Sequence, residues 1–299
     1  MKHPFILSCE STVDLPYSYV AARDIEVLFY SYTMEGKVYE DDMGRDDSAI
    51  KIFYQAVKDG KMPTTSQINT YTYYDYFKAL LQKGDVLHIA LGSGMTPSVR
   101  NAREAGEMLK KELPDKKLTI IDSLGACGGY GMIVDNAADM RDKGMGMDEL
   151  EQYTLEQVKY QEYQFFSTDL SQFKRSGRVS GVAAAAATIL GICPIMHLDA
   201  TGHIIAYDKV RGKKNAIART VDTMADRAQD GTQYSGKCFV NHSSCPEDAL
   251  ETKKLIRKTF PNLRDVRILD IGTIIGSHTG IGTVAVFYTG EKEKAVDKK

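Results

Sequence analysis

The chain has 299 residues, of which 43% are hydrophobic and 26% charged, and its formal net charge is -2. This balance excludes a global basic field of the kind that draws a protein to nucleic acid or to an anionic membrane, so any anion site has to be local. The length exceeds the usual size of one core, which favours two domains over a single large α/β domain.

The N-terminal region and the cysteines indicate a cytoplasmic protein. The apolar run Phe5–Leu7 is far shorter than the core of a signal peptide, and no stretch approaches ~18 apolar residues, so we expect neither secretion nor an integral membrane segment. The five cysteines are widely spaced and form no Cys-x-x-Cys pair, which indicates reduced thiols.

Strands and helices alternate through residues 1–160, which predicts an N-terminal α/β domain. The expected strands are Phe5–Leu7, Ile25–Met34, Val86–Leu91 and Leu118–Ile121. The expected helices are Asp47–Lys58, Thr70–Gln82, Ser98–Glu112, Leu124–Lys143 and Met147–Tyr160. Residues 92–96 and 122–123 follow neighbouring strands, so we expect these two polar turns at one edge of the sheet, where open α/β sheets bind ligands.

Residues 161–290 form the second predicted domain, and residues 291–299 a charged tail. The expected strands are Gln164–Thr168, Pro194–Leu198, His203–Val210, Lys237–Asn241, Val266–Leu269 and Thr283–Tyr288, the second and third forming a hairpin. We expect a basic loop at Phe173–Arg178 and helices at Ala183–Ala187, Lys213–Gln229 and Pro246–Thr259.

Three polar turns carry the candidate site. They are Ser277–Gly280, expected as a Gly-rich turn between two strands, Pro63–Gln67 and Gly92–Thr96. Their hydroxyls and N–H groups predict a clamp for a carboxylate or phosphate. The supporting residues are Ser66, Gly94, Thr96, Ser277 and Thr279.

Other readings of these residues stay open. Ser93 follows a predicted strand, as the nucleophile of a hydrolase does, although the spacing of the glycines is wrong for G-x-S-x-G. For His278 three roles are open: a general base, a donor to a carboxylate, and a turn histidine that is bonded to the backbone. Arg178 and Arg211 belong to basic clusters that are either solvated or dock a phosphate or an acidic partner. The His242–Cys245 segment offers only two ligands, so we expect no metal site.

Seven motifs in order resemble the DegV family of fatty-acid-binding proteins, the B subunits that present acyl chains to a separate fatty acid kinase. The seven motifs are Cys9–Pro16, Pro63–Gln67, Gly92–Ser98, Ile121–Ser123 with the Gly-rich segment after it, Ser176–Ser180, Lys209–Lys213 and Gly276–Gly280. The sequence departs from the family pattern at Glu10 in place of Asp, Cys193 in place of Lys and Ile281 in place of Pro, and the third motif departs from it at Gly92 and Pro97.

The resemblance implies two α/β domains, the first mainly parallel with an α/β/α arrangement and the second with a mixed sheet, and a long-chain fatty acid in a slot between them. It implies that Thr65, Ser93 and His278 hold the carboxylate, that Arg178 and Arg211 face the kinase, and that the chain is a carrier with no cofactor and no catalysis of its own. Two alternatives remain: a stand-alone hydrolase or acyltransferase that uses Ser93 and His278, and a binder of another lipid.

Overall fold

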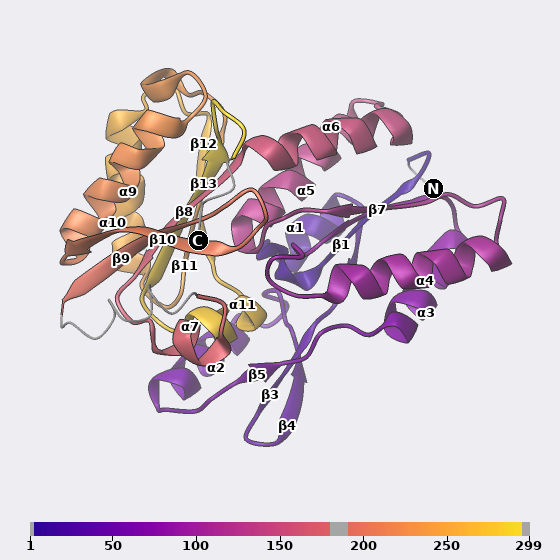
Figure 1. Ribbon diagram of the computed structural model, residues 1–299, viewed down its shortest axis with the longest axis horizontal. Coiled ribbons are helices and arrows are strands. Elements are labelled where there is room, and N and C mark those ends of the chain that lie inside the picture. Colours follow the sequence, from indigo (N-terminus) through magenta and orange to yellow (C-terminus); the bar gives the residue numbers. More distant parts are fainter. Residues whose placement is uncertain (1–2, 180–190, 295–299) are drawn as a thin grey trace.

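The structure is a computed structural model that describes residues 3–179 and 191–294. Strands in the N-terminal half form a four-stranded parallel sheet in the order β2-β1-β6-β7. Its strands are β1 (Ile6–Glu10), β2 (Ile25–Leu28), β6 (Val86–Ala90) and β7 (Leu118–Asp122). Figure 1 shows α3 (Thr70–Leu81) and α4 (Ser98–Glu112) on one side of it, and α5 (Cys127–Asp142) and α6 (Met147–Tyr160) on the other.

A small antiparallel sheet in the order β4-β3-β5 projects from this half (Figure 1). Its strands are β3 (Ser31–Met34), β4 (Lys37–Glu40) and β5 (Thr64–Thr65). The remaining helices of the half are η1 (Ser11–Val13), α1 (Tyr17–Ala22) and α2 (Ala49–Lys58). The chain leaves the parallel sheet after Leu28 because Tyr30 donates its N–H to Ser11 Oγ at 3.1 Å and accepts from the Asp41 N–H at 2.9 Å. The single predicted strand Ile25–Met34 is therefore wrong, since β2 and β3 belong to different sheets.

The C-terminal half contains a six-stranded mixed sheet in the order β10-β9-β8-β13-β11-β12, in which only β11 and β12 pair in parallel. Its strands are β8 (Gln161–Ser167), β9 (Ile192–Leu198), β10 (Ile204–Arg211), β11 (Lys237–His242), β12 (Asp265–Asp270) and β13 (Thr283–Thr289). The other elements are α7 (Ser171–Ser176), α9 (Lys213–Arg227), η2 (Gly231–Gln233), α10 (Pro246–Thr259) and α11 (Thr273–Thr279). Helices α9 and α10 cover the outer face (Figure 1).

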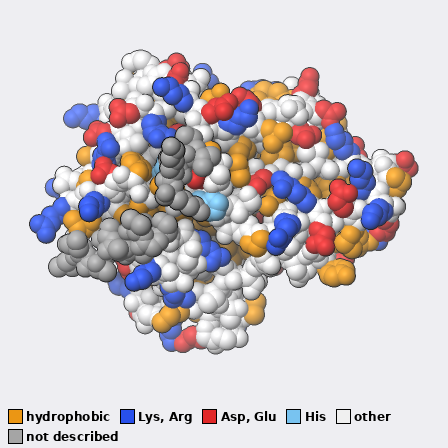
Figure 2. All heavy atoms as spheres, viewed as in Figure 1, with side chains coloured by type: hydrophobic (Ala, Val, Ile, Leu, Met, Phe, Trp, Pro, Cys, Tyr) orange, Lys and Arg blue, Asp and Glu red, His pale blue; other side chains and the backbone are white. Residues whose placement is uncertain are grey.

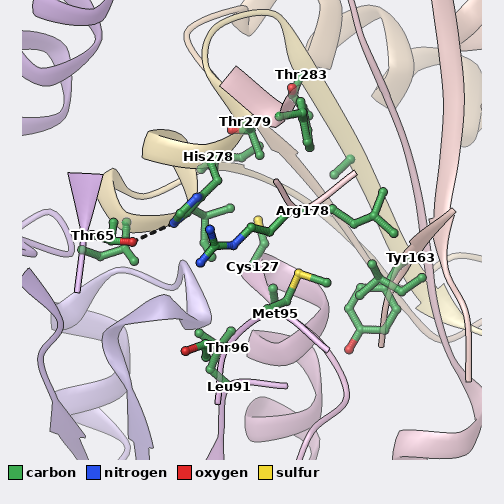
Figure 3. Close-up of a pocket in the computed structure, with 18 of the residues that line it drawn as sticks. Thr65, Leu91, Met95, Thr96, Cys127, Tyr163, Arg178, His278, Thr279 and Thr283 are labelled. Carbon is green, nitrogen blue, oxygen red and sulfur yellow. Dashed lines mark hydrogen bonds between the residues drawn. The ribbon is translucent and has the colours of Figure 1, made fainter. Parts of the chain in front are cut away.

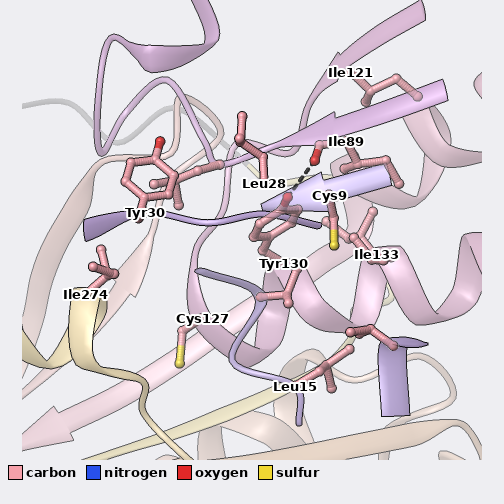
Figure 4. Packing of buried hydrophobic residues seen from close by; sticks show 14 of the residues in the cluster. Cys9, Leu15, Leu28, Tyr30, Ile89, Ile121, Cys127, Tyr130, Ile133 and Ile274 are labelled. Atoms are coloured by element: carbon pink, nitrogen blue, oxygen red, sulfur yellow. Dashed lines mark hydrogen bonds between the residues drawn. The ribbon is translucent and has the colours of Figure 1, made fainter. Parts of the chain in front are cut away.

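The two halves meet across α5, which packs on the four-stranded sheet and also contacts β8, β11 and β13. Figure 4 shows Tyr130 and Ile133 of α5 beside Cys9 and Ile89 of the sheet, where the Tyr130 hydroxyl donates to the Ile89 carbonyl. On the opposite side α5 needs glycine, because a Cβ on Gly129 would lie 2.2 Å from the Tyr163 ring. Since α5 serves both sheets, the domain boundary at residue 160 stays a prediction.

A buried charge cluster also joins the halves. Asp135 of α5 is fully buried, and its carboxylate forms ion pairs with Nζ of Lys237 on β11 at 2.5 Å and with the guanidinium of Arg23 at 3.1 Å. Because removing one partner of a buried ion pair leaves an uncompensated charge, this cluster fixes the register of α5 against β11. Elsewhere Figure 2 shows basic and acidic side chains interspersed on the face in view, in keeping with the near-zero net charge.

The hairpin predicted at Pro194–Val210 is confirmed as β9 and β10. All five cysteines are free and buried. Two other predictions are wrong. The basic loop Phe173–Arg178 is largely helix α7, which ends at Gly177 with φ 71°. The turn Ser277–Gly280 is the last part of helix α11, whose first bond runs from the Gly276 N–H to the Gly272 carbonyl at 2.7 Å. The helix predicted at Ala183–Ala187 lies outside the described residues.

Candidate ligand-binding cavity

A cavity of about 280 Å³ lies between the carboxyl end of β6, the start of helix α5, helix α11 and the inner face of the six-stranded sheet. Its volume is close to the lower end of the range for small-molecule sites, ~300–1,000 Å³. Most of its wall is apolar and comes from both halves, including Leu91, Met95, Ala126, Phe165, Leu198, Ile204, Ile274 and Phe287. The polar lining includes Thr65, Ser66, Thr96, Arg178, His278 and Thr279.

Thr65 and His278 form a hydrogen bond between the two halves. Thr65 lies on β5, which pairs with Tyr32 on β3, and His278 lies in the last turn of α11. Thr65 Oγ1 and His278 Nε2 are 2.8 Å apart (Figure 3). The structure thus brings together two of the three residues predicted to hold a carboxylate, although they are 213 positions apart in the sequence.

The environment of His278 keeps its imidazole neutral. Burial, reinforced by the positive charges of Arg178 and Arg175, lowers the pKa of His278 to about 4. Nδ1 is buried and, within the described part of the chain, has no hydrogen-bond partner. A neutral imidazole and a threonine hydroxyl carry two hydrogens between them and use one in their mutual bond. Either tautomer therefore leaves one O–H or N–H donor for another molecule.

Two arginines stand beside this pair. Figure 3 shows the Arg178 guanidinium extending toward His278, and Arg178 is an exposed residue of the cavity lining. Arg175 of α7 donates to the main-chain oxygen of Pro63 at 3.0 Å, which holds α7 against the segment that carries Thr65. The polar end of the cavity thus combines neutral donors with positive charge, an environment that favours an anion.

The loop after β6 contributes Thr96 and not Ser93. Ser93 is exposed and lies outside the cavity lining, and its N–H donates to Asp122 Oδ1 at 3.0 Å. This bond joins the two polar turns at one sheet edge, as predicted. Gly94 packs against the β9–β10 hairpin, where a Cβ would lie 2.3 Å from Gly202 O. Thr96 lines the cavity instead, with its hydroxyl 3.1 Å from Ser98 Oγ, so the geometry does not support the central role predicted for Ser93.

The remaining predicted site residues lie in different places. Ser66 and Thr279 line the cavity, whereas Ser277 is buried within α11 and donates to Thr273 O at 2.7 Å. Arg211 is exposed at the end of β10, seven residues from the cavity-lining Ile204, or about 23 Å along a strand. The structure therefore separates Arg211 from Arg178, and its role in docking stays a prediction.

Sequence reasoning missed the aromatic hydroxyls of the cavity. Tyr30 and Tyr163 line it, and among the described residues neither buried hydroxyl has a hydrogen-bond partner. Cys127 also faces it, and burial raises the pKa of this thiol well above its ordinary value, so the thiol is un-ionised. Tyrosines and cysteines in apolar segments carry no signal that separates cavity lining from ordinary core.

These features define a class: two-domain α/β proteins that enclose an apolar cavity with one polar, anion-favouring end. Within the described ranges no helix is long and apolar enough to cross a membrane. The same ranges hold no group of three or more His, Cys, Asp or Glu side chains arranged to bind a metal ion.

The chain belongs to the DegV family, because the model of the uncharacterised DegV family matches residues 7–291. It is 32% identical over 292 residues to a DegV domain-containing protein of Clostridium perfringens, covering 97% of this chain and 99% of that protein. A fatty-acid-binding DegV family protein of Thermus thermophilus has a TM-score of 0.84 at 21% identity, with 96% and 99% of the two chains covered. The Streptococcus pneumoniae fatty acid kinase B3 protein, loaded with linoleic acid, has a TM-score of 0.81 at 18% identity, with 95% and 99% covered.

Proposed function

We propose that this protein is a carrier that buries a long-chain fatty acid in the interdomain cavity, with the carboxylate at the end formed by Thr65 and His278. The observation that carries the proposal is the 2.8 Å bond between these residues, which leaves one donor of the pair free at the polar end of a cavity whose wall is mostly apolar. Solved DegV structures with bound fatty acid share the fold and support the choice of ligand.

The apolar wall supplies most of the binding free energy. A chain of ~14 methylenes gains at most about 11 kcal/mol on burial at ~0.8 kcal/mol each, before the costs of ordering and desolvation are subtracted. An apolar ligand without an acid group would gain the same amount. The polar end therefore determines orientation and selectivity for an acid.

The carboxylate is held by Thr65, Thr96 and the neutral His278, with Arg178 as its counter-charge. Thr96 takes the place of Ser93 because it lines the cavity from the same loop. Hydrogen bonds to a charged group contribute ~1.5–3 kcal/mol each, so the one free donor of the Thr65–His278 pair and the hydroxyl of Thr96, together with the charge of Arg178, suffice to fix which end of the ligand enters last. The supporting residues are Ser66 and Thr279, whereas Gly94 and Ser277 shape the loop and the helix.

We further propose that the exposed head group is phosphorylated by a partner fatty acid kinase, which makes this chain the substrate-presenting half of a cytoplasmic two-component enzyme without a cofactor of its own. The Streptococcus pneumoniae kinase B3 protein supports this role through its shared fold. The hydrolase alternative lacks geometric support, because the hydroxyl bonded to His278 belongs to Thr65, and a histidine with a pKa of about 4 is a weak base.

Binding measurements on the delipidated protein test the proposal. Palmitate should bind with one-to-one stoichiometry, and palmitate methyl ester, which keeps the chain and lacks the charge, should bind at least about tenfold more weakly. Equal affinity for the acid and the ester would contradict the proposed carboxylate clamp. Binding of neither compound would contradict the proposed carrier function. Release of methanol from the ester by the isolated chain would favour the hydrolase.

A further inference from the structure

A second cavity, of about 100 Å³, lies at the other end of α11. Asp14, Asp41, Asp42 and Asp270 dominate its polar lining, together with the hydroxyls of Ser11 and Thr273. Among the described residues that line it, none is Lys, Arg or His. The cavity therefore gathers carboxyl groups in a largely apolar wall that contains no positive side chain.

Two of these carboxylates are buried and incompletely bonded. Asp14 is 7% exposed and Asp41 is 1% exposed. Asp41 Oδ1 accepts from Thr273 Oγ1 at 2.8 Å, whereas in the described structure Asp41 Oδ2 and both carboxylate oxygens of Asp14 meet no donor with good hydrogen-bond geometry. The Ser11 hydroxyl lies near Asp41, and the Cys127 thiol and the Gly272 N–H lie near Asp14. Arg45, the basic residue of the same loop, donates instead to the main-chain oxygen of Asp41 at 2.9 Å and to Glu40.

Such an arrangement is costly while the cavity contains only water. Both carboxyl groups are buried, and only one of their four oxygens meets a donor with hydrogen-bond geometry among the described residues. A buried carboxylate is tolerated when it is paired or coordinates a cation. The missing partner here is positive.

We propose that this cavity binds one Mg²⁺ ion, with Asp14 and Asp41 as its protein ligands and water in the other coordination positions. The donors are oxygen atoms only, which suit hard cations, and two carboxylates balance a charge of +2. Asp42 and Asp270 also line the cavity, but the described residues hold no three such side chains placed to share one ion, so the larger ligand set of a Ca²⁺ site does not fit. Mg²⁺ keeps several waters and typically binds through one or two carboxylates, and the cavity has room for a few.

The proposed ion would join the two halves of the molecule. Asp14 and Asp41 come from the N-terminal half, whereas Gly272 and Thr273 begin α11. The contact with α11 is close, because a Cβ on Gly272 would lie 2.5 Å from Asp14 Oδ1. The other end of α11 carries His278, so the ion would steady the helix that presents the head-group site. The inference does not depend on which ligand the larger cavity takes.

Calorimetric titration and thermal unfolding of the full chain test this site. After treatment with EDTA and dialysis, titration with MgCl₂ at constant ionic strength should give saturable one-site binding and raise Tm by at least about 2 °C. Asp14→Asn and Asp41→Asn should each weaken Mg²⁺ binding at least about tenfold. Asp47→Asn is the matched control, since it removes an exposed carboxylate from the same segment, and it should respond to Mg²⁺ as the wild type does.

Wild-type protein alone can overturn the proposal, even where a variant fails to fold. The absence of saturable binding up to about 10 mM Mg²⁺, above the ~1 mM of weak oxygen-ligand sites, would do so. Unchanged Mg²⁺ binding in folded Asp14→Asn and Asp41→Asn would place the ion elsewhere. A chain that ignores Mg²⁺ but gains stability as the pH falls from 7 to 5 would show that protons, and not a cation, neutralise the pair.

Discussion

Replacing Thr65 by Val tests the head-group clamp with the smallest change in shape. The substitution removes the hydroxyl that bonds to His278 Nε2 at 2.8 Å and keeps a β-branched side chain on β5. In the variant, His278 keeps its one polar hydrogen but the hydroxyl hydrogen of Thr65 is gone. Either the ligand carboxylate then loses a hydrogen-bond donor, or His278 loses the hydrogen bond that orients its ring. Fatty acid binding should weaken, and the fold should persist because Thr65 is only partly buried.

The structure sets the size of this effect. A hydrogen bond to a charged group contributes ~1.5–3 kcal/mol, and 1.4 kcal/mol corresponds to a tenfold change in Kd. Because Thr65 is only partly buried, we expect the lower end, or about a tenfold weaker affinity for palmitate. Binding of palmitate methyl ester should change much less, since its uncharged head group gains less from each donor.

Fluorescence displacement or calorimetry on delipidated protein measures both affinities. Thr64→Val is the matched control, because Thr64 is exposed on the same strand and its side chain points to the other face. The reasoning is refuted if folded Thr65→Val binds palmitate as tightly as the wild type, or if Thr64→Val weakens binding equally.

Three further predictions follow from the cavity and from α5. Thr96→Val should weaken palmitate binding several-fold while Ser93→Ala leaves Kd unchanged, and the reverse order in the same assay would restore Ser93 as the donor. The pKa of His278 is about 4 in the folded chain and ~6.5 in the unfolded chain, so its contribution to stability is complete above pH 6.5 and falls by up to about 3 kcal/mol as the pH is lowered to 4. In urea unfolding, His278→Gln should therefore lose less stability between pH 6.5 and pH 4 than the wild type does. Equal losses in the two proteins would contradict the low pKa. Gly129→Ala should lower the free energy of unfolding by ~1–3 kcal/mol, because its Cβ would meet the Tyr163 ring at 2.2 Å, and an unchanged denaturation midpoint would show that α5 shifts freely.

Regular elements were predictable where local signals agree. The helices predicted near Ser98–Glu112, Met147–Tyr160 and Pro246–Thr259 match α4, α6 and α10 to the residue. Apolar residues recur at helical spacing in α4, and Pro246 is placed at the start of α10. The motifs also predicted the family and the two-domain α/β fold correctly.

The site was predictable only in part, because its geometry depends on contacts between distant segments. Thr65 and His278 were both named from their motifs, but α11 looked like a turn, since its glycines at 272, 276 and 280 mask a short helix. The choice between Ser93 and Thr96 rests on the bond from Ser93 to Asp122 and on the packing of Gly94 against Gly202. No local pattern in the sequence contains that information.

A crystal structure of the chain with bound palmitate tests the central claim most directly. The carboxylate should lie within hydrogen-bond distance of Thr65 Oγ1 or His278 Nδ1, with the acyl chain running between Leu198, Phe165 and Phe287. Palmitate bound in the opposite direction, with its carboxylate among these apolar residues, would contradict the proposed clamp. Palmitate bound outside the interdomain cavity would contradict the carrier role assigned to it.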